Sequence, residues 1–230
     1  MASTEPQRPG MTRPEQVRVW DLPTRVFHWS LAGLVLCSWV TAENGYLKLH
    51  LCSGLTLLTL LLFRLIWGFA GSTTARYADF ASGPRQALAY LRAVARGEQQ
   101  PHAGHNPAGS WMVLVLLAVL LVQAGTGLFS NDGVRFNGPL AAQVSSALSD
   151  RLTSLHAAMF NVTLLLVWLH IVAVLFYRYV CGENLVAAMI NGLKPRSQLP
   201  ARANLKFVAL HWALLSLSLA AALVWWIAKS

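Results

Sequence analysis

The chain has 230 residues, of which 55% are hydrophobic and only 12% are charged, and its formal net charge is +9. This composition is typical of an integral membrane protein, because the apolar runs reach the length of about 20 residues that spans a bilayer. Backbone groups in lipid need internal partners, so we expect an all-α helical bundle. The basic residues are not clustered on a soluble module, which argues against a nucleic-acid-binding protein.

Five apolar runs are predicted to cross the membrane as helices. The expected spans are residues 25–41, 46–69, 108–129, 154–180 and 205–228. A polar tail, residues 1–24, precedes them and is predicted to be cytoplasmic, partly disordered and not a cleaved signal peptide. Pro23 suits the first turn of the first helix, and Trp20 and Trp29 are expected in the interfacial aromatic belt.

The connections between the spans contain two further predicted helices. An amphipathic helix over residues 84–96, with apolar residues at helical spacing, is expected to lie on the inner leaflet. A short helix is expected over residues 184–191. The outer loop, residues 130–153, contains Gly and Pro residues that break regular structure, and residues 140–148 form a weakly amphipathic stretch.

The basic residues predict the orientation of the bundle. Fourteen of the eighteen fall on one side of the five-span arrangement, and the exceptions are Lys48, Arg135, Arg151 and Lys229. The positive-inside rule then places the N-terminus in the cytoplasm and the C-terminus on the outer side of the membrane.

The fourth span contains two histidines, His156 and His170, in an otherwise almost wholly hydrophobic run. Fourteen residues separate them, so their rings fall within about 40° of each other on one helix face and roughly 21 Å apart along the axis. One helix therefore presents an imidazole near each side of the bilayer core. This geometry suits two stacked haems better than a single site.

Depth in the membrane pairs these histidines with two others. His28 lies near the inner end of the first span, as His170 does in the fourth, and His50 lies near the outer end of the second span, as His156 does. Each pair is a candidate set of axial ligands. The alternative for each histidine is an interhelical hydrogen bond, and a zinc site would need Cys or carboxylate ligands or a tighter cluster. Haem iron accepts two imidazoles, and the porphyrin fills a bundle core.

Two arginines and one glycine favour haem. Arg64 lies fourteen residues after His50, on the same helix face and at the depth of the inner pair, and Arg25 lies one turn before His28. Arginine binds carboxylates such as haem propionates in fork geometry, whereas snorkelling to the inner leaflet is the alternative for both. Gly54, one turn after His50, leaves room for a porphyrin, although ordinary helix packing explains it equally well.

Three other histidines lack a clear role. His102 and His105 precede the third span and fit a polar loop that caps this helix, with a quinone or partner contact as the alternative. His211, near the inner end of the fifth span, is expected to serve packing or to lie beside lipid or quinone. The chain has no C-x-x-C-H motif, so no covalent c-type haem is expected.

Several segments match one known family. They are residues 20–29 (WDLPTRVFHW), 63–68 (FRLIWG), 104–109 (GHNPAG) and the two-histidine fourth span. In these segments the chain resembles the bacterial di-haem cytochromes b of the cytochrome b561 and nickel-iron hydrogenase b-subunit group. The segments are spread over most of residues 19–195, and the resemblance implies a cytochrome b of the bacterial inner membrane. We expect its domain to comprise residues 25–230, and with the charge pattern its C-terminus is expected to be periplasmic. The resemblance also implies two haem b groups, with a four-helix haem-binding core, held by His28, His50, His156 and His170.

The sequence departs from the family next to the outer histidines. The family often has Glu and Trp there, but Leu51 and Cys52 follow His50, and two alanines follow His156. The departure puts in doubt any proton or contact role of those positions and leaves the ligands untouched.

The resemblance implies electron transfer in a respiratory chain between the quinone pool and a partner redox protein. The partner would be a periplasmic c-type cytochrome or a hydrogenase-like enzyme subunit, docking on the outer loop. One alternative is a stand-alone superoxide:quinone oxidoreductase, in which Lys48, Arg135 and Arg151 attract the anion. Another is a membrane anchor subunit of a larger complex, with the fifth span as its packing surface.

Overall fold

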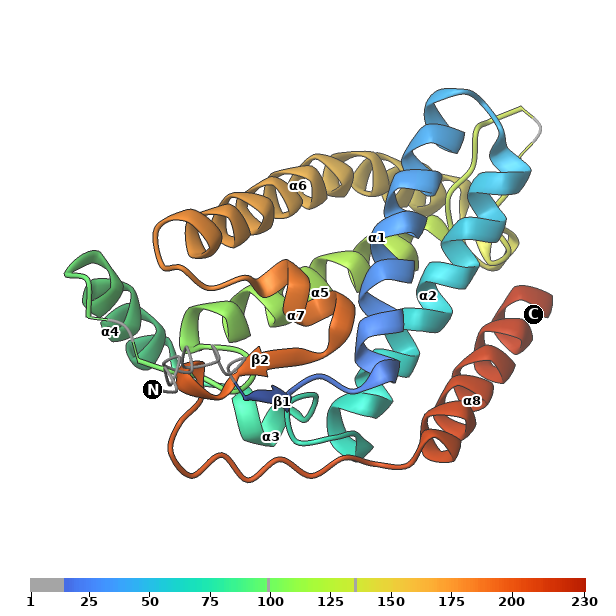
Figure 1. The fold of residues 1–230 in the computed structure, drawn as a ribbon. Helices are drawn as coiled ribbons and strands as arrows, with labels where there is room; N and C mark the ends of the chain where they lie inside the picture. The colour runs from blue at the N-terminus through green and yellow to red at the C-terminus, as the bar shows by residue number, and fades with distance from the viewer. Residues whose placement is uncertain (1–14, 99, 135) are drawn as a thin grey trace, which may run out of the picture.

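The computed structural model describes residues 15–98, 100–134 and 136–230 (Figure 1). Arg135 and tail residues 1–14, which entered the sequence predictions, lie outside this part of the chain. Five helices are long and apolar enough to cross a membrane. They are α1 (Leu22–Glu43), α2 (Leu47–Ala70), α5 (Pro107–Gly127), α6 (Ser146–Tyr179) and α8 (Leu210–Lys229). The predicted all-α membrane bundle is confirmed.

Shorter elements lie between the long helices. They are the strands β1 (Gln16–Arg18) and β2 (Leu193–Pro195), the helices α3 (Tyr77–Phe80), α4 (Pro84–Ala95) and α7 (Leu185–Asn191), and the 3-10 helices η1 (Ala141–Gln143) and η2 (Arg196–Gln198). The two strands pair in antiparallel register, with Val17 opposite Lys194. This small sheet, α3, α4 and α7 gather at one end of the bundle (Figure 1).

Helix α2 is the centre of the packing. It packs along α1 and also contacts α5 and α8, while α5 packs along α6. Leu61 and Trp67 of α2 are completely buried in the main apolar cluster. Helix α8 lies against α2 at the edge of the bundle, away from α6 (Figure 1). The helices α1, α2, α5 and α6 therefore form a four-helix unit that α8 flanks.

A single carboxylate begins α1 and joins it to α2. Asp21 caps α1 by accepting the backbone N–H of Thr24 at 2.9 Å, as short polar side chains do at helix starts. Its second oxygen accepts the indole N–H of Trp67 at 3.1 Å. Asp21 is buried, and both of its oxygens have partners.

The end of the tail next to α1 differs from its prediction. Val19 and Trp20 are only 0% and 5% exposed and cluster with Ala188 and Leu199. The position in the aromatic belt predicted for Trp20 is wrong, because the pairing of β1 with β2 packs its side chain inside the protein. Trp29, at 45% exposure, keeps a surface position.

Two helices begin elsewhere than the apolar pattern indicates. Helix α6 begins at Ser146, earlier than expected, because the Ser145 hydroxyl accepts the N–H of Leu148 and caps a polar first turn. Helix α8 begins later than expected, because the preceding segment is bound to the α2–α3 connection. There the N–H of Thr73 donates to the carbonyl of Lys206 at 3.0 Å.

Candidate functional site

The structure brings four histidines of three helices together in two pairs. His28 of α1 faces His170 of α6, with ring centroids 6.2 Å apart, and His50 of α2 faces His156 of α6 at 6.0 Å. We call these the inner and the outer pair. Helix α6 contributes one ring to each pair, so its backbone fixes their separation.

The spacing within each pair fits a shared metal ion better than a direct contact. Metal–imidazole bonds are about 2 Å long, so two rings on opposite sides of one ion have centroids roughly 6 Å apart. A direct hydrogen bond of about 3 Å would bring the centroids to about 5 Å. Both pairs lie in the described part of the chain, and no hydrogen bond links their rings.

The donor set at each pair fits haem iron rather than zinc. Within the described ranges, no three His, Cys, Asp or Glu side chains gather where they could hold a metal ion. The three cysteines are free thiols. Structural zinc takes four such ligands and catalytic zinc takes three, whereas two imidazoles complete the coordination of a haem iron.

Backbone carbonyls of neighbouring helices orient the outer pair. Nδ1 of His50 lies 2.8 Å from the carbonyl oxygen of Ser38 on α1, and Nδ1 of His156 lies 2.8 Å from that of Gln123 on α5. A carbonyl accepts only from N–H, so Nδ1 carries the hydrogen in both rings, and the lone pair of Nε2 is left available for a metal ion. The Gln123 amide approaches Nε2 of His156 only at 3.4 Å.

Two glycines shape the space around the outer pair. A Cβ atom at Gly127 of α5 would lie 2.9 Å from Cε1 of His156, so the missing side chain lets this ring rest against α5. A Cβ at Gly54 would meet no atom within 4 Å. The position predicted to admit a porphyrin thus borders open space.

Arg64 is a buried cation beside the inner end of α2. It is 2% exposed, and its guanidinium carbon lies 5.1 Å from the ring centre of Tyr77 and 5.8 Å from that of Phe80. Its Nη1 is buried and has no hydrogen-bond partner. No carboxylate of the described residues forms an ion pair with it, and the oxygens of Asp21 are bonded to Thr24 and Trp67. A buried charge without a counter-charge is costly, so this site suits an anion from outside the chain.

Two side-chain nitrogens of α1 also have no hydrogen-bond partner. Nδ1 of His28 is buried without a hydrogen bond, and so is Nε of Arg25. The Nη1 group of Arg25 donates to the carbonyl oxygen of Ile190 at the end of α7. Arg25 is therefore anchored to α7 with part of its donor capacity unused.

His105 lies in the loop predicted to cap α5, and its ring packs inside the inner region. Its ring lies 4.9 Å from that of Trp20 and 4.6 Å from that of Phe80, and its Nδ1 is buried without a partner. Burial and then the nearby charge of Arg64 lower the pKa of His105 to about 3, so the imidazole is neutral. The loop does cap α5 as predicted, through Asn106, whose Oδ1 accepts the N–H of Gly109 at 2.7 Å.

The other two unassigned histidines lie farther from the pairs. Nδ1 of His102 bonds the carbonyl of Gln100 at 2.7 Å, and its ring meets Tyr90 of α4. His211 is exposed in the first turn of α8. Sequence reasoning also missed Tyr177 of α6, whose hydroxyl bonds Tyr90 at 2.8 Å and accepts from the Asn106 amide at 2.8 Å.

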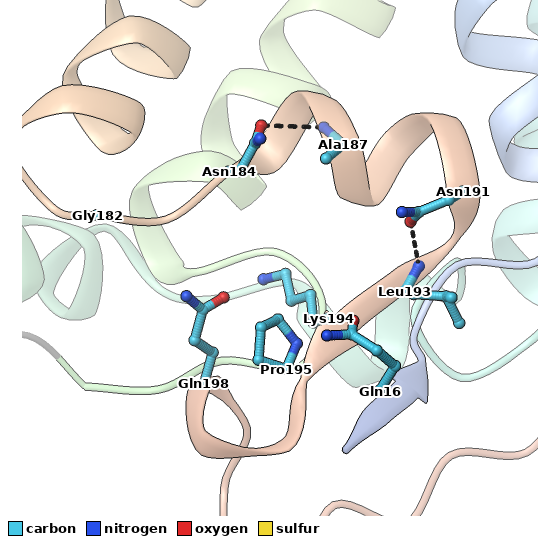
Figure 2. A pocket seen from close by; sticks show the side chains of 9 residues that line it. All are labelled: Gln16, Gly182, Asn184, Ala187, Asn191, Leu193, Lys194, Pro195 and Gln198. Atoms are coloured by element: carbon cyan, nitrogen blue, oxygen red, sulfur yellow. Dashed lines mark hydrogen bonds between the residues drawn. The ribbon is translucent and has the colours of Figure 1, made fainter. Parts of the chain in front are cut away.

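A pocket of about 310 Å³ lies between α7 and the small sheet (Figure 2). Its wall includes Gln16, Gln198 and Lys194, which is buried and forms an ion pair with Glu183. None of the residues predicted as functional lines it. The pocket therefore belongs to the packing of the segment after α6, not to the histidine pairs.

Comparison with known proteins identifies a family. A family model described as prokaryotic cytochrome b561 matches residues 19–192. A search of curated proteins found no match. The matched range contains both histidine pairs, Arg64 and His105, and it ends before α8.

Proposed function

The chain belongs to the prokaryotic cytochrome b561 family, a family of membrane b-type haem proteins of electron transfer, and we propose that it is a di-haem cytochrome. In this proposal it carries electrons across the bacterial membrane between the quinone pool and a partner redox protein. The observation that carries the proposal is the two histidine pairs, each at a metal-bridging separation and both built on α6.

Four histidines are the proposed axial ligands. His28 and His170 would hold the inner haem, and His50 and His156 the outer haem. A bound b-type haem supplies an iron that gains and loses one electron. Two imidazoles on each iron leave no open coordination position, so these residues would favour electron transfer over binding of substrate at the metal.

Other residues would position the cofactors. The Ser38 and Gln123 carbonyls hold the outer rings in one tautomer and increase the basicity of their coordinating nitrogens. Arg64 has an unused donor, Nη1, and would bind a propionate carboxylate. Arg25, three residues before His28, has an unused donor at Nε and would bind a propionate in the same way. Gly54 would leave space for the porphyrin face.

The charge pattern and the outer loop support the proposed membrane orientation and a docking surface for the partner. The excess of basic residues on the side of the small sheet supports a cytoplasmic N-terminus and a periplasmic C-terminus. The outer loop is tied to α6, since the N–H of Asn131 donates to Thr153 at 3.0 Å, and it offers a fixed surface to a c-type cytochrome or enzyme subunit. A quinone headgroup would exchange electrons beside one of the haems.

The haem content of the purified protein tests this proposal. We expect b-type bands in the reduced-minus-oxidised spectrum and two haems per chain in the pyridine haemochrome assay. A protein that folds in detergent and binds no b-type haem would refute the function, and one haem per chain would refute the two-site arrangement.

A stand-alone superoxide:quinone oxidoreductase is a second candidate. Lys48 and Arg151, on the outer side, are exposed and form no ion pair with another described residue, so they are free to attract a small anion. Stopped-flow mixing of the isolated chain with superoxide distinguishes the two functions. Rapid haem reduction that slows in K48Q and R151Q variants would favour the second candidate.

A further inference from the structure

The ring of His105 is held rigidly at the inner end of the bundle. Trp20 packs on it edge-on, with ring planes at 64°, and Phe80 packs on it at 52°. The loop that carries it is fixed by the Asn106 cap of α5 and by Gly104, where a Cβ would lie 3.2 Å from Thr74. The polar edge of this ring nevertheless has an unused nitrogen, because Nδ1 is buried without a partner.

The same small region contains a second unused donor. Phe80 contacts both Arg64, at 5.8 Å from the guanidinium carbon, and His105, at 4.6 Å between ring centres. Both side chains therefore lie around one aromatic ring, and each has a buried nitrogen without a hydrogen bond. Arg64 donates from Nη1, and a neutral imidazole donates from Nδ1 in one of its two tautomers, so a shared anionic acceptor would satisfy both nitrogens.

We propose that His105 donates a hydrogen bond from Nδ1 to a propionate carboxylate of the inner haem, beside the ion pair made by Arg64. The inference rests on the proposed function, because it needs a haem at the His28–His170 pair. His105 is then a positioning residue: as a neutral donor it fixes the carboxylate and withdraws negative charge from it. Weaker carboxylate charge favours the reduced iron, so the bond raises the inner midpoint potential.

Two substitutions separate this role from simple packing. H105F keeps an aromatic ring between Trp20 and Phe80 and removes the nitrogen, whereas H105N places an amide N–H close to the position of Nδ1 and removes the aromatic ring. H102F is the matched control, since His102 lies in the same loop and its Nδ1 already bonds Gln100.

The test uses the full-length protein loaded with haem that carries carbon-13 at the propionate carboxyls. Infrared redox-difference spectra then report the labelled carboxylates, and those absent in H170A belong to the inner haem. We expect H105F to shift the inner bands and lower the inner midpoint potential, while H105N and H102F resemble the original protein.

Unchanged bands in H105F, changed bands in H105N, or equal shifts in H105F and H102F would overturn the inference. If H105F yields no protein with two haems, H105N alone decides, because unchanged bands support a donor and changed bands refute it. Failure of the proposed function is separate, since it would leave the unsubstituted protein without b-type haem.

Discussion

The outer and inner histidine pairs are arranged by different means. In the outer pair both rings are oriented by carbonyl groups of the adjacent helices, at 2.8 Å from Ser38 and from Gln123. In the inner pair Nδ1 of His28 has no partner, and unsatisfied nitrogens of Arg64 and His105 lie in the same end of the bundle. The chain itself orients the outer rings, whereas at the inner end these three buried nitrogens have no hydrogen-bond partner among the described residues.

If each pair holds a haem, as proposed, this difference predicts unlike midpoint potentials for the two haems. A carbonyl partner would make the outer imidazoles more basic, which would favour the oxidised iron. Arg64, a buried cation at the inner end of α2, would favour the reduced iron of the inner haem, because that iron has one positive charge fewer. Four predictions use this comparison.

The largest effect is expected when an axial ligand is removed. H28A and H170A should each lose the inner haem, and H50A and H156A the outer one, because one remaining imidazole with no second ligand holds the iron weakly. Haem content by pyridine haemochrome should fall by about half in every variant. Retention of two haems in any of them would contradict the assignment of that residue.

The second largest effect is expected when the buried cation Arg64 is removed, which should weaken binding of the inner haem. A charge-assisted hydrogen bond contributes about 1.5–3 kcal/mol, so R64M should weaken inner haem retention roughly 10- to 150-fold. Haem transfer to apomyoglobin in detergent measures this loss. R76M is the control, since Arg76 lies outside the spans and already pairs with Asp79. If R64M weakened retention of the inner and the outer haem equally, Arg64 would not act locally at the inner site.

The outer site should respond to a single added methyl group. In G127A the new Cβ would lie 2.9 Å from the His156 ring, so the ring must move and its bond to Gln123 must lengthen. We expect a shifted outer midpoint potential and altered low-spin electron paramagnetic resonance signals from that haem only. G125A adds the same group two residues away, where no atom lies within 4 Å, and should leave both haems unchanged.

The smallest expected effect is the difference in midpoint potential between the two haems of the unaltered protein. A spectroelectrochemical titration should resolve two midpoint potentials, and the higher should be the one that disappears in H170A. If the higher potential disappears in H156A instead, the electrostatic part of the comparison is wrong.

Hydropathy was enough to predict the membrane bundle, and the resemblance of a few segments to a known family predicted its family. Fourteen residues separate His156 from His170 in one apolar run, and that spacing alone predicts two imidazoles on one face. The relation of Arg64 to the inner pair follows from the same arithmetic. These features depend on positions within single helices, which sequence spacing describes well.

Features that depend on distant segments could not be predicted in this way. Trp20 is buried because β1 pairs with a strand that begins at Leu193, and an apolar pattern does not show such pairing. The partners of His50 and His156 are backbone carbonyls, which every residue has, so the sequence does not mark them. The ring of His105 packs on Phe80 of α3, a contact between a loop and a short helix at the inner end of the bundle.

Double substitutions test the central claim most directly, because they ask which histidines share a haem. If His28 and His170 hold one haem, H28A/H170A should keep one haem per chain, whereas H28A/H156A should keep none. Haem content per folded chain, measured in the same detergent, gives the answer. Loss of both haems from H28A/H170A, or retention of one in H28A/H156A, would contradict the two-pair arrangement on α6.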